Sequence, residues 1–126
     1  MDEGRNKQGF TLGVKEIWEV EPSRYRKGFI LHTMGYPQGR DTFGGGFLYS
    51  AGENRVFIGM VASFDSPDPA LDVHEKLQLY KKHPDIAPMF ENGRLTGYGA
   101  RVIPEGGWFA LPELCTGGAL IIGDAA

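Results

Sequence analysis

Three consecutive glycines, Gly44, Gly45 and Gly46, interrupt an otherwise strand-like segment between Thr42 and Ser50. Each glycine inside a regular element costs roughly 0.5–1 kcal/mol relative to alanine, so the triplet requires some compensating role. The usual compensations are a bulge, a positive φ angle, or the close approach of a ligand or of another backbone. Aromatic neighbours favour a ligand, because bare backbone amides and carbonyls beside aromatic surface suit a flat, partly polar molecule. A bulged turn without a ligand is the alternative, and the flanking aromatic residues are Phe43, Phe47 and Tyr49.

The sequence contains no familiar arrangement of nucleophile, base or metal ligands. There is no Gly-x-Ser-x-Gly motif, and no phosphate-binding Gly-x-Gly-x-x-Gly stands between a strand and a helix. The single cysteine, Cys115, and three widely separated histidines give no zinc or iron–sulfur spacing. We therefore predict no catalytic residue and no metal ligand in this chain, and we expect Cys115 to be a small buried residue.

A second candidate site lies at the end of the chain, where Gly123 and Asp124 follow the apolar run Ala119–Ile122. A carboxylate after a buried strand, at the mouth of a helix, can accept hydrogen bonds from ribityl or ribose hydroxyls. A plain Asp N-cap is the other interpretation. A strand that runs into Gly-Asp-Ala-Ala normally continues into a helix, so we expect these 126 residues to be a piece of a longer protein.

Composition and charge restrict the class of protein. Hydrophobic residues make up 41% and charged residues 23%, which is ordinary for one small soluble domain. The net charge of −3 argues against a nucleic-acid partner, which requires a basic surface. The N-terminus lacks the apolar region of a signal peptide, and no apolar run reaches the roughly 18 residues of a membrane span.

Hydrophobic periodicity predicts several strands and one main helix. The helix covers residues 69–83, with Asp68 as N-cap and with Val73, Leu77 and Tyr80 on its buried face. A short helical turn is possible within residues 85–90. Alternation in the first strand buries Leu12, Val14, Trp18 and Val20. Glu16 and Glu19 fit its polar face only approximately, so the pattern does not fix the register near Lys15–Ile17. The expected strands are Leu12–Val20, Phe29–Met34, Phe47–Tyr49, Arg55–Ala62 and Leu95–Ile103, followed by the terminal run Ala119–Ile122.

This pattern indicates the α+β class, with an antiparallel or mixed β-sheet and one main helix packed on one face. The segment from Phe47 to Ala62 reads as a hairpin around Gly52–Asn54. We expect a flexible lead-in at residues 1–11, a ligand-binding domain at residues 12–116, and a terminal strand with a truncated turn at residues 117–126.

Motifs along nearly the whole chain resemble the electron-transfer flavoprotein:ubiquinone oxidoreductase family. They occur in the same order, between about residues 12 and 124, which makes the resemblance specific. The motifs are Gly13-Val-Lys-Glu-Ile-Trp-Glu-Val20, His32-Thr33, Phe43-Gly-Gly-Gly-Phe-Leu-Tyr49, Lys82-His-Pro84, Tyr98-Gly-Ala-Arg101, Glu105-Gly-Gly107 and Gly117-Gly118.

The resemblance implies a site. A Tyr-Gly-Gly segment in this family supplies backbone hydrogen bonds to a quinone carbonyl, which places the predicted quinone site at Phe43, Gly44, Gly45 and Gly46. Phe43 stands where tyrosine is usual, and Gly46 stands where serine is common. Gly123 and Asp124 would contact FAD, although many members have Gly-Cys-Ser there. Residues 12–116 would be the quinone-binding domain, and residues 117–126 the returning strand of an FAD domain.

The resemblance also implies an activity for a longer parent protein. The family passes electrons from reduced electron-transfer flavoprotein, through FAD and an iron–sulfur cluster, to membrane ubiquinone. The cluster would lie outside this chain, and the chain alone would be inactive. A bacterial parent would be a peripheral protein on the cytoplasmic side of the inner membrane. Alternatives are a fragment of a geranylgeranyl-reductase-like or aromatic-hydroxylase-like flavoprotein, and a free-standing module that binds an apolar ligand.

Overall fold

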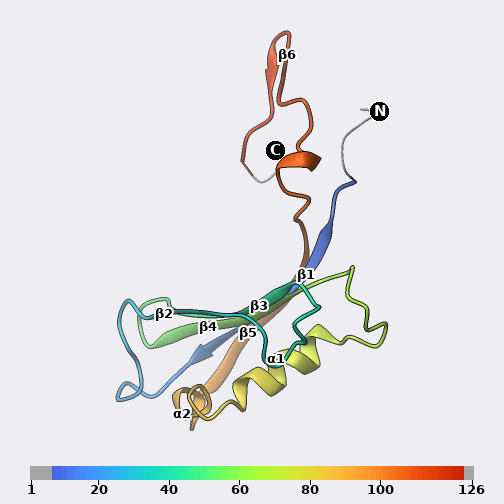
Figure 1. The fold of residues 1–126 in the computed structure, drawn as a ribbon. Coiled ribbons are helices and arrows are strands. Elements are labelled where there is room, and N and C mark those ends of the chain that lie inside the picture. Colours follow the sequence, from blue (N-terminus) through green and yellow to red (C-terminus); the bar gives the residue numbers. More distant parts are fainter. Residues whose placement is uncertain (1–6, 124–126) are drawn as a thin grey trace.

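A five-stranded antiparallel sheet, with helices on one face, forms the body of the protein in the computed structural model, which describes residues 7–123 (Figure 1). The order across the sheet is β2-β3-β4-β1-β5. This arrangement confirms the expected α+β class. The strands of the sheet are β1 (Phe10–Glu19), β2 (Ile30–Thr33), β3 (Gly44–Ser50), β4 (Arg55–Ser63) and β5 (Arg94–Pro104).

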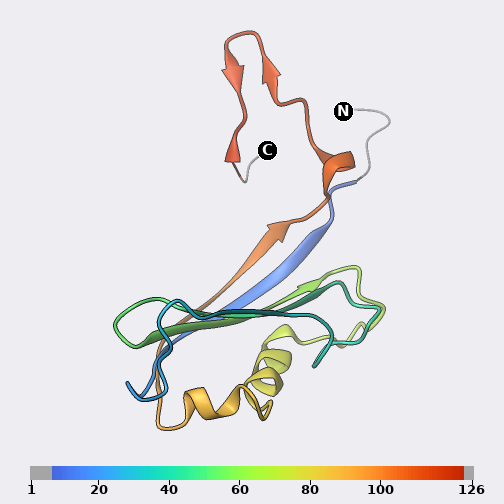
Figure 2. The same ribbon diagram turned by 60° about the vertical axis from the view of Figure 1, so that its left-hand side comes forward.

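Helix α1 (Val73–Lys81) and the short α2 (Ala87–Phe90) lie on the same face of this sheet (Figures 1 and 2). We call this the helix-covered face and the other the helix-free face. Residues directly opposite each other in antiparallel strands point to the same face. On β4 the residues at even positions are buried toward α1, whereas Phe57, Gly59 and Val61 belong to the helix-free face. The core comprises Val14, Val20, Leu48, Val56, Ile58, Met60, Ala62, Val73, Leu77, Tyr80 and Ile86.

Strand β1 follows the expected alternation, with one correction. Leu12, Val14 and Trp18 lie on the helix-covered face, as predicted, and the strand begins at Phe10 rather than Leu12. Glu16 was expected on the polar face, but it lies on the helix-covered face, where it is only 4% exposed. A carboxylate tolerates this position because Lys81 donates to it from α1.

Helix α1 buries Val73, Leu77 and Tyr80, as its spacing predicts. It begins four residues later than expected, because Asp72 rather than Asp68 is the N-cap. The Asp72 carboxylate accepts hydrogen bonds from the backbone amides of His74, at 2.8 Å, and Glu75, at 3.1 Å. Asp68 instead accepts from the amide of Ala70, at 2.9 Å, within the preceding turn. The expected short helical turn is α2.

Beyond β5 the chain projects away from the sheet, as Figure 2 shows. This extension contains the 3-10 helix η1 (Trp108–Ala110) and a small hairpin of β6 (Cys115–Thr116) and β7 (Ala119–Leu120). The run Ala119–Ile122 was expected to form a buried strand, but Leu120 is 67% and Ile122 is 74% exposed. Cys115 is also exposed rather than buried. The physical reason is that, within residues 7–123, β7 pairs only with the two-residue β6.

None of the helices within residues 7–123 is long and apolar enough to cross a membrane.

Candidate functional site

All three glycines of the Gly44–Gly46 stretch are required by contacts within the chain. Gly44 has a φ of 141°, and a Cβ atom there would lie 2.1 Å from the carbonyl oxygen of Val61. A Cβ atom on Gly45 would lie 2.1 Å from the carbonyl oxygen of Thr33. A Cβ atom on Gly46 would lie 2.5 Å from a carbon of the Tyr80 ring. Close approach of other parts of the protein, one of the expected compensations, therefore accounts for the triplet.

The three glycines Gly44–Gly46 do not all lie on the same face of the sheet. Gly45 lies opposite Val61, on the helix-free face, whereas Gly46 lies opposite Met60 and faces α1. Gly46 is buried beneath Tyr80, so it is not exposed at the predicted site. Phe43, which immediately precedes β3, carries an exposed ring.

The backbone polar groups of the stretch alternate in direction. The Ser63 amide donates to the Phe43 carbonyl, at 2.8 Å, so the backbone carbonyl of Phe43 points toward β4. In an antiparallel ladder the next residue, Gly44, then points toward the β2 side of β3. The last pair between β2 and β3 joins Thr33 to Gly46, so β2 does not extend as far as Gly44. The Gly44 amide and carbonyl thus face the position where a partner strand has ended.

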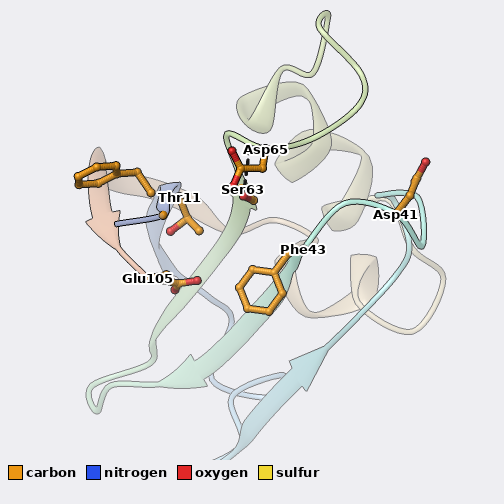
Figure 3. Close-up of a pocket in the computed structure, with 8 residues that line it drawn as sticks. Thr11, Asp41, Phe43, Ser63, Asp65 and Glu105 are labelled. Carbon is orange, nitrogen blue, oxygen red and sulfur yellow. Dashed lines mark hydrogen bonds between the residues drawn. The ribbon is translucent and has the colours of Figure 1, made fainter. Parts of the chain in front are cut away.

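A hollow of about 350 Å³ adjoins Phe43 at this end of the sheet (Figure 3). It brings together residues that are distant in sequence, since the start of β1 lies beside the ends of β4 and β5. Of the residues that the structure describes, three with carboxylates line it and none with a cationic side chain does. The side chain of Asp41 points away from the Phe43 ring (Figure 3). The lining residues are Gly9, Phe10, Thr11, Asp41, Phe43, Ser63, Asp65 and Glu105.

Two polar side chains hold the glycine stretch in place, and periodicity alone did not reveal either one. The Gln38 side-chain amide donates to the Val61 carbonyl, at 2.8 Å, which is the atom that crowds Gly44. The Thr33 hydroxyl donates to the Tyr80 hydroxyl, at 3.0 Å, and so fixes the ring over Gly46. Burial raises the pKa of Tyr80 above its ordinary value of 10.0, and the Thr33 hydrogen bond partly opposes this shift.

Of the two residues of the second predicted site, Gly123 and Asp124, the structure describes only Gly123. Gly123 is exposed and has a φ of 72°, a conformation that suits glycine in a tight turn. Asp124 lies outside the described residues. Among residues 7–123 no group of three or more histidine, cysteine or acidic side chains is arranged to hold a metal ion.

The fold and the hollow together define a small α+β domain with a ligand-sized recess at one end of its sheet. Comparison with known families makes this more specific. The chain belongs to the family described as "ETF-QO, ubiquinone-binding", whose model matches residues 10–103. The matched range covers α1, α2 and all of the five-stranded sheet except its last residue, Pro104.

Curated relatives agree with this assignment. The chain is 40% identical over 123 residues to a probable mitochondrial electron transfer flavoprotein-ubiquinone oxidoreductase of Saccharomyces cerevisiae, covering 98% of this chain and 20% of the relative. It is 36% identical to the Pseudomonas aeruginosa enzyme of that name, covering 98% of this chain and 22% of the relative. It is 39% identical to the human mitochondrial enzyme, covering 92% of this chain and 19% of the relative. The chain thus spans about one fifth of the length of these relatives.

Proposed function

We propose that this chain is the quinone-binding part of an oxidoreductase that passes electrons from reduced electron-transfer flavoprotein to ubiquinone. The proposal rests on the family match, on relatives that carry this name, and on the position of the Gly44 backbone. A quinone carbonyl accepts hydrogen bonds, and an amide directed past the end of β2 can donate one without breaking the sheet. The ring of Phe43 lies beside this amide and offers a flat apolar surface for the quinone ring.

The predicted residues take different roles in this proposal. Gly44 supplies the backbone groups, Gly45 lies next to them and pairs with Val61 of β4, and Phe43 supplies the surface that contacts the ring. Gly46 contributes indirectly, because its lack of a side chain lets Tyr80 pack against β3. Gln38 positions the site by holding the Val61 carbonyl next to Gly44.

The cofactors of the proposed parent lie mostly beyond this chain. When bound, FAD would supply the electron-transfer chemistry between the donor protein and the quinone. Gly123 fits a tight turn at the edge of an FAD site, and Asp124 would contact the cofactor. The single cysteine, Cys115, cannot hold an iron–sulfur cluster by itself, since a cluster needs several thiolates, so a cluster would depend on cysteines elsewhere in the parent.

We also propose a peripheral membrane location for the parent, on the cytoplasmic side of the inner membrane in a bacterium. Ubiquinone is apolar, so its site has to open toward a bilayer. The segment between β2 and β3 supports this, because it carries three exposed apolar side chains, those of Met34, Tyr36 and Phe43, of which Phe43 lines the hollow.

A titration of the purified chain with a soluble short-tail ubiquinone tests the proposal. Amide chemical shifts are followed for Gly44 and Gly45, with Gly28 in a distant turn as an internal reference. Saturable shifts at the two site glycines, without change at Gly28, are the expected result. A folded chain whose Gly44 and Gly45 amides do not respond would contradict a quinone site that this chain holds by itself.

A further inference from the structure

Strand β5 forms one edge of the sheet, and the middle of this strand is open to a further strand. It is the last strand in the order β2-β3-β4-β1-β5, so no strand within residues 7–123 lies on its outer side. A register shift opposite Ile17 and Trp18 disturbs one end of β5, and Pro104, which has no amide hydrogen, ends the other. A regular segment lies between them, residues 97–103, which we call the β5 edge.

The backbone groups of the β5 edge point alternately toward β1 and outward. The Glu105 amide donates to the Gly9 carbonyl, at 2.8 Å, so these two residues form a hydrogen-bonded pair. In an antiparallel ladder such pairs recur at every second residue. The amides and carbonyls of the residues between them therefore point away from β1, and these residues are Tyr98, Ala100 and Val102. Their donors and acceptors are left for a partner outside residues 7–123.

The side chains of the same three residues lie on the helix-covered face, but α1 does not bury them. Ala100 lies opposite Val14, and Tyr98 lies opposite Glu16. Val14 and Glu16 are buried, whereas Tyr98 is 84% and Val102 is 49% exposed. An apolar strip thus runs along the β5 edge, beside the outward backbone groups.

The β5 edge lacks the features that normally protect an edge in solvent. Natural edge strands are kept short or are interrupted by charges, prolines and bulges. At the opposite edge of the sheet, β2 is only four residues long. The β5 edge is longer and carries one charged residue, Arg101, whose side chain lies on the helix-free face because it is opposite Gly13. Open backbone groups beside exposed apolar side chains fit an edge that another segment covers.

We infer that the β5 edge pairs with an extended segment from the remaining polypeptide of the parent protein, which adds a further strand to the sheet. The inference rests on the proposed function in one respect, namely that this chain is part of a longer protein. The chain spans about one fifth of its relatives' length, so most of such a parent lies outside it and can supply the segment. The segment should be apolar at the positions beside Tyr98 and Val102, so that it covers the strip as well as the backbone.

A second copy of the chain fits this edge less well. Two copies that paired about Ala100 would place their Arg101 side chains diagonally across the new pair of strands, on the same face. Long side chains reach each other at this separation, and like charges there repel. A segment of different sequence avoids this repulsion.

Amide hydrogen exchange, resolved to single residues by mass spectrometry, compares the 126-residue chain with the full-length parent. In the chain, the amides of Tyr98, Ala100 and Val102 should exchange fast, whereas those of Gly99 and Arg101, which point toward β1, should exchange slowly and show that the sheet has formed. In the parent, the three outward amides should exchange at least roughly tenfold more slowly than in the chain. The measurement needs no quinone.

The variant Ala100→Pro tests whether strand pairing causes this protection. Proline is tolerated on an edge strand where the amide would face outward, so the pairing of β5 with β1 should persist. In the parent, the variant should return the amides of Tyr98 and Val102 to the fast exchange of the isolated chain. Ala100→Ser is the matched control, because it keeps the amide at this position, and it should leave the two neighbouring amides slow. Thermal unfolding shows that both variants are folded.

Three results would overturn the assignment. The first is equal exchange of the outward amides in the unchanged parent and the unchanged chain. The second is slow exchange in the parent that a folded Ala100→Pro variant does not alter, since strand pairing would then not be its cause. The third is slow exchange that appears in the chain itself as its concentration rises, which would make a second copy the partner. The ubiquinone titration reports on the Phe43 hollow, so either proposal can fail without the other.

Discussion

The ring of Tyr80 occupies the space in which a side chain at position 46 would lie. A Cβ atom on Gly46 would be 2.5 Å from one ring carbon and 2.7 Å from another. The Thr33 hydroxyl, which donates to the Tyr80 hydroxyl at 3.0 Å, prevents the ring from moving aside without loss of a hydrogen bond. Helix α1 therefore sets the position of the glycine stretch by direct contact with its backbone.

This contact predicts that Gly46→Ala destabilises the fold. A methyl group would overlap the ring, and repacking around one extra group in a dense core costs roughly 1–3 kcal/mol. Urea unfolding should show a free energy of unfolding lower by that amount. Gly117→Ala is the matched control, since nothing lies within 4 Å of its Cβ position, and should change stability little. Equal stability of the Gly46→Ala variant and the unchanged chain would show that Tyr80 does not pack there.

Glu16 forms the most buried ion pair among the described residues. Its carboxylate accepts hydrogen bonds from the Lys81 ammonium at 2.6 Å, the Trp18 indole at 2.7 Å and the Gln78 amide at 3.0 Å. The Lys81 ammonium also lies 4.9 Å from the centroid of the Trp18 ring. Glu16→Gln would leave Lys81, whose side chain is only 14% exposed, without its charged partner.

We expect Glu16→Gln to lower the free energy of unfolding by roughly 3–5 kcal/mol, as removal of one partner of a buried pair does. Chemical denaturation at neutral pH measures the effect. Glu53→Gln is the control, because Glu53 pairs with Arg55 in the solvent and should contribute less than about 1 kcal/mol. A loss no larger than that of the control would mean that the Glu16 pair adds no stability.

The same carboxylate predicts a pH dependence. Burial raises the pKa of Glu16, but hydrogen bonds from Lys81, Gln78 and Trp18, and the charge of Lys81, outweigh it and hold the pKa below its ordinary value of 4.5. A lowered pKa means that the folded state binds this proton less readily than the unfolded state. The stabilisation is therefore complete above about pH 4.5 and disappears as the pH falls through the folded-state pKa.

Thermal unfolding of the unchanged chain and of Glu16→Gln, measured between neutral pH and about pH 3, should reveal this. The difference in midpoint between them should be largest at neutral pH and should shrink as the pH falls below the ordinary Glu value of 4.5. Two curves that remain parallel throughout would show that protonation of Glu16 is not coupled to folding.

The N-terminus of α1 gives a prediction that separates two neighbouring carboxylates. Asp72 accepts from two backbone amides of the first turn, whereas Asp68 accepts from one amide in the preceding loop. Asp72→Ala should therefore cost about 1 kcal/mol, the usual cost of a lost N-cap, and Asp68→Ala should cost less. Urea denaturation of both variants measures these losses. A larger loss of stability in Asp68→Ala than in Asp72→Ala would show that Asp68 is the N-cap.

The sequence predicted those elements that depend on local patterns. The spacing of Val73, Leu77 and Tyr80 identified the buried face of α1, and alternation identified β1 and β4, because both signals repeat within a few residues. The predicted N-cap, Asp68, was wrong. Asp68 and Asp72 are chemically equivalent, and only the path of the chain decides which of them caps the helix.

Features that depend on contacts between distant segments of the chain could not be read from the sequence. The burial of Glu16 depends on Lys81, which lies 65 positions away. The hollow at Phe43 is formed by Thr11, Ser63 and Glu105, and only the register of β1 with β4 and β5 brings them together. Periodicity describes one strand at a time, so it contains no information about such neighbours.

Phe43 provides the most direct test of the candidate site. Its ring is 64% exposed beside the hollow, so its removal should not disturb the core. We expect Phe43→Ala to weaken binding of a short-tail ubiquinone roughly tenfold through loss of the ring contact, and Phe43→Tyr to retain binding. Phe64→Ala is the matched control, since Phe64 is similarly exposed, at 58%, but does not line the hollow. The measurement is the amide-shift titration at Gly44 and Gly45, and equal affinities of the two alanine variants would remove Phe43 from the site.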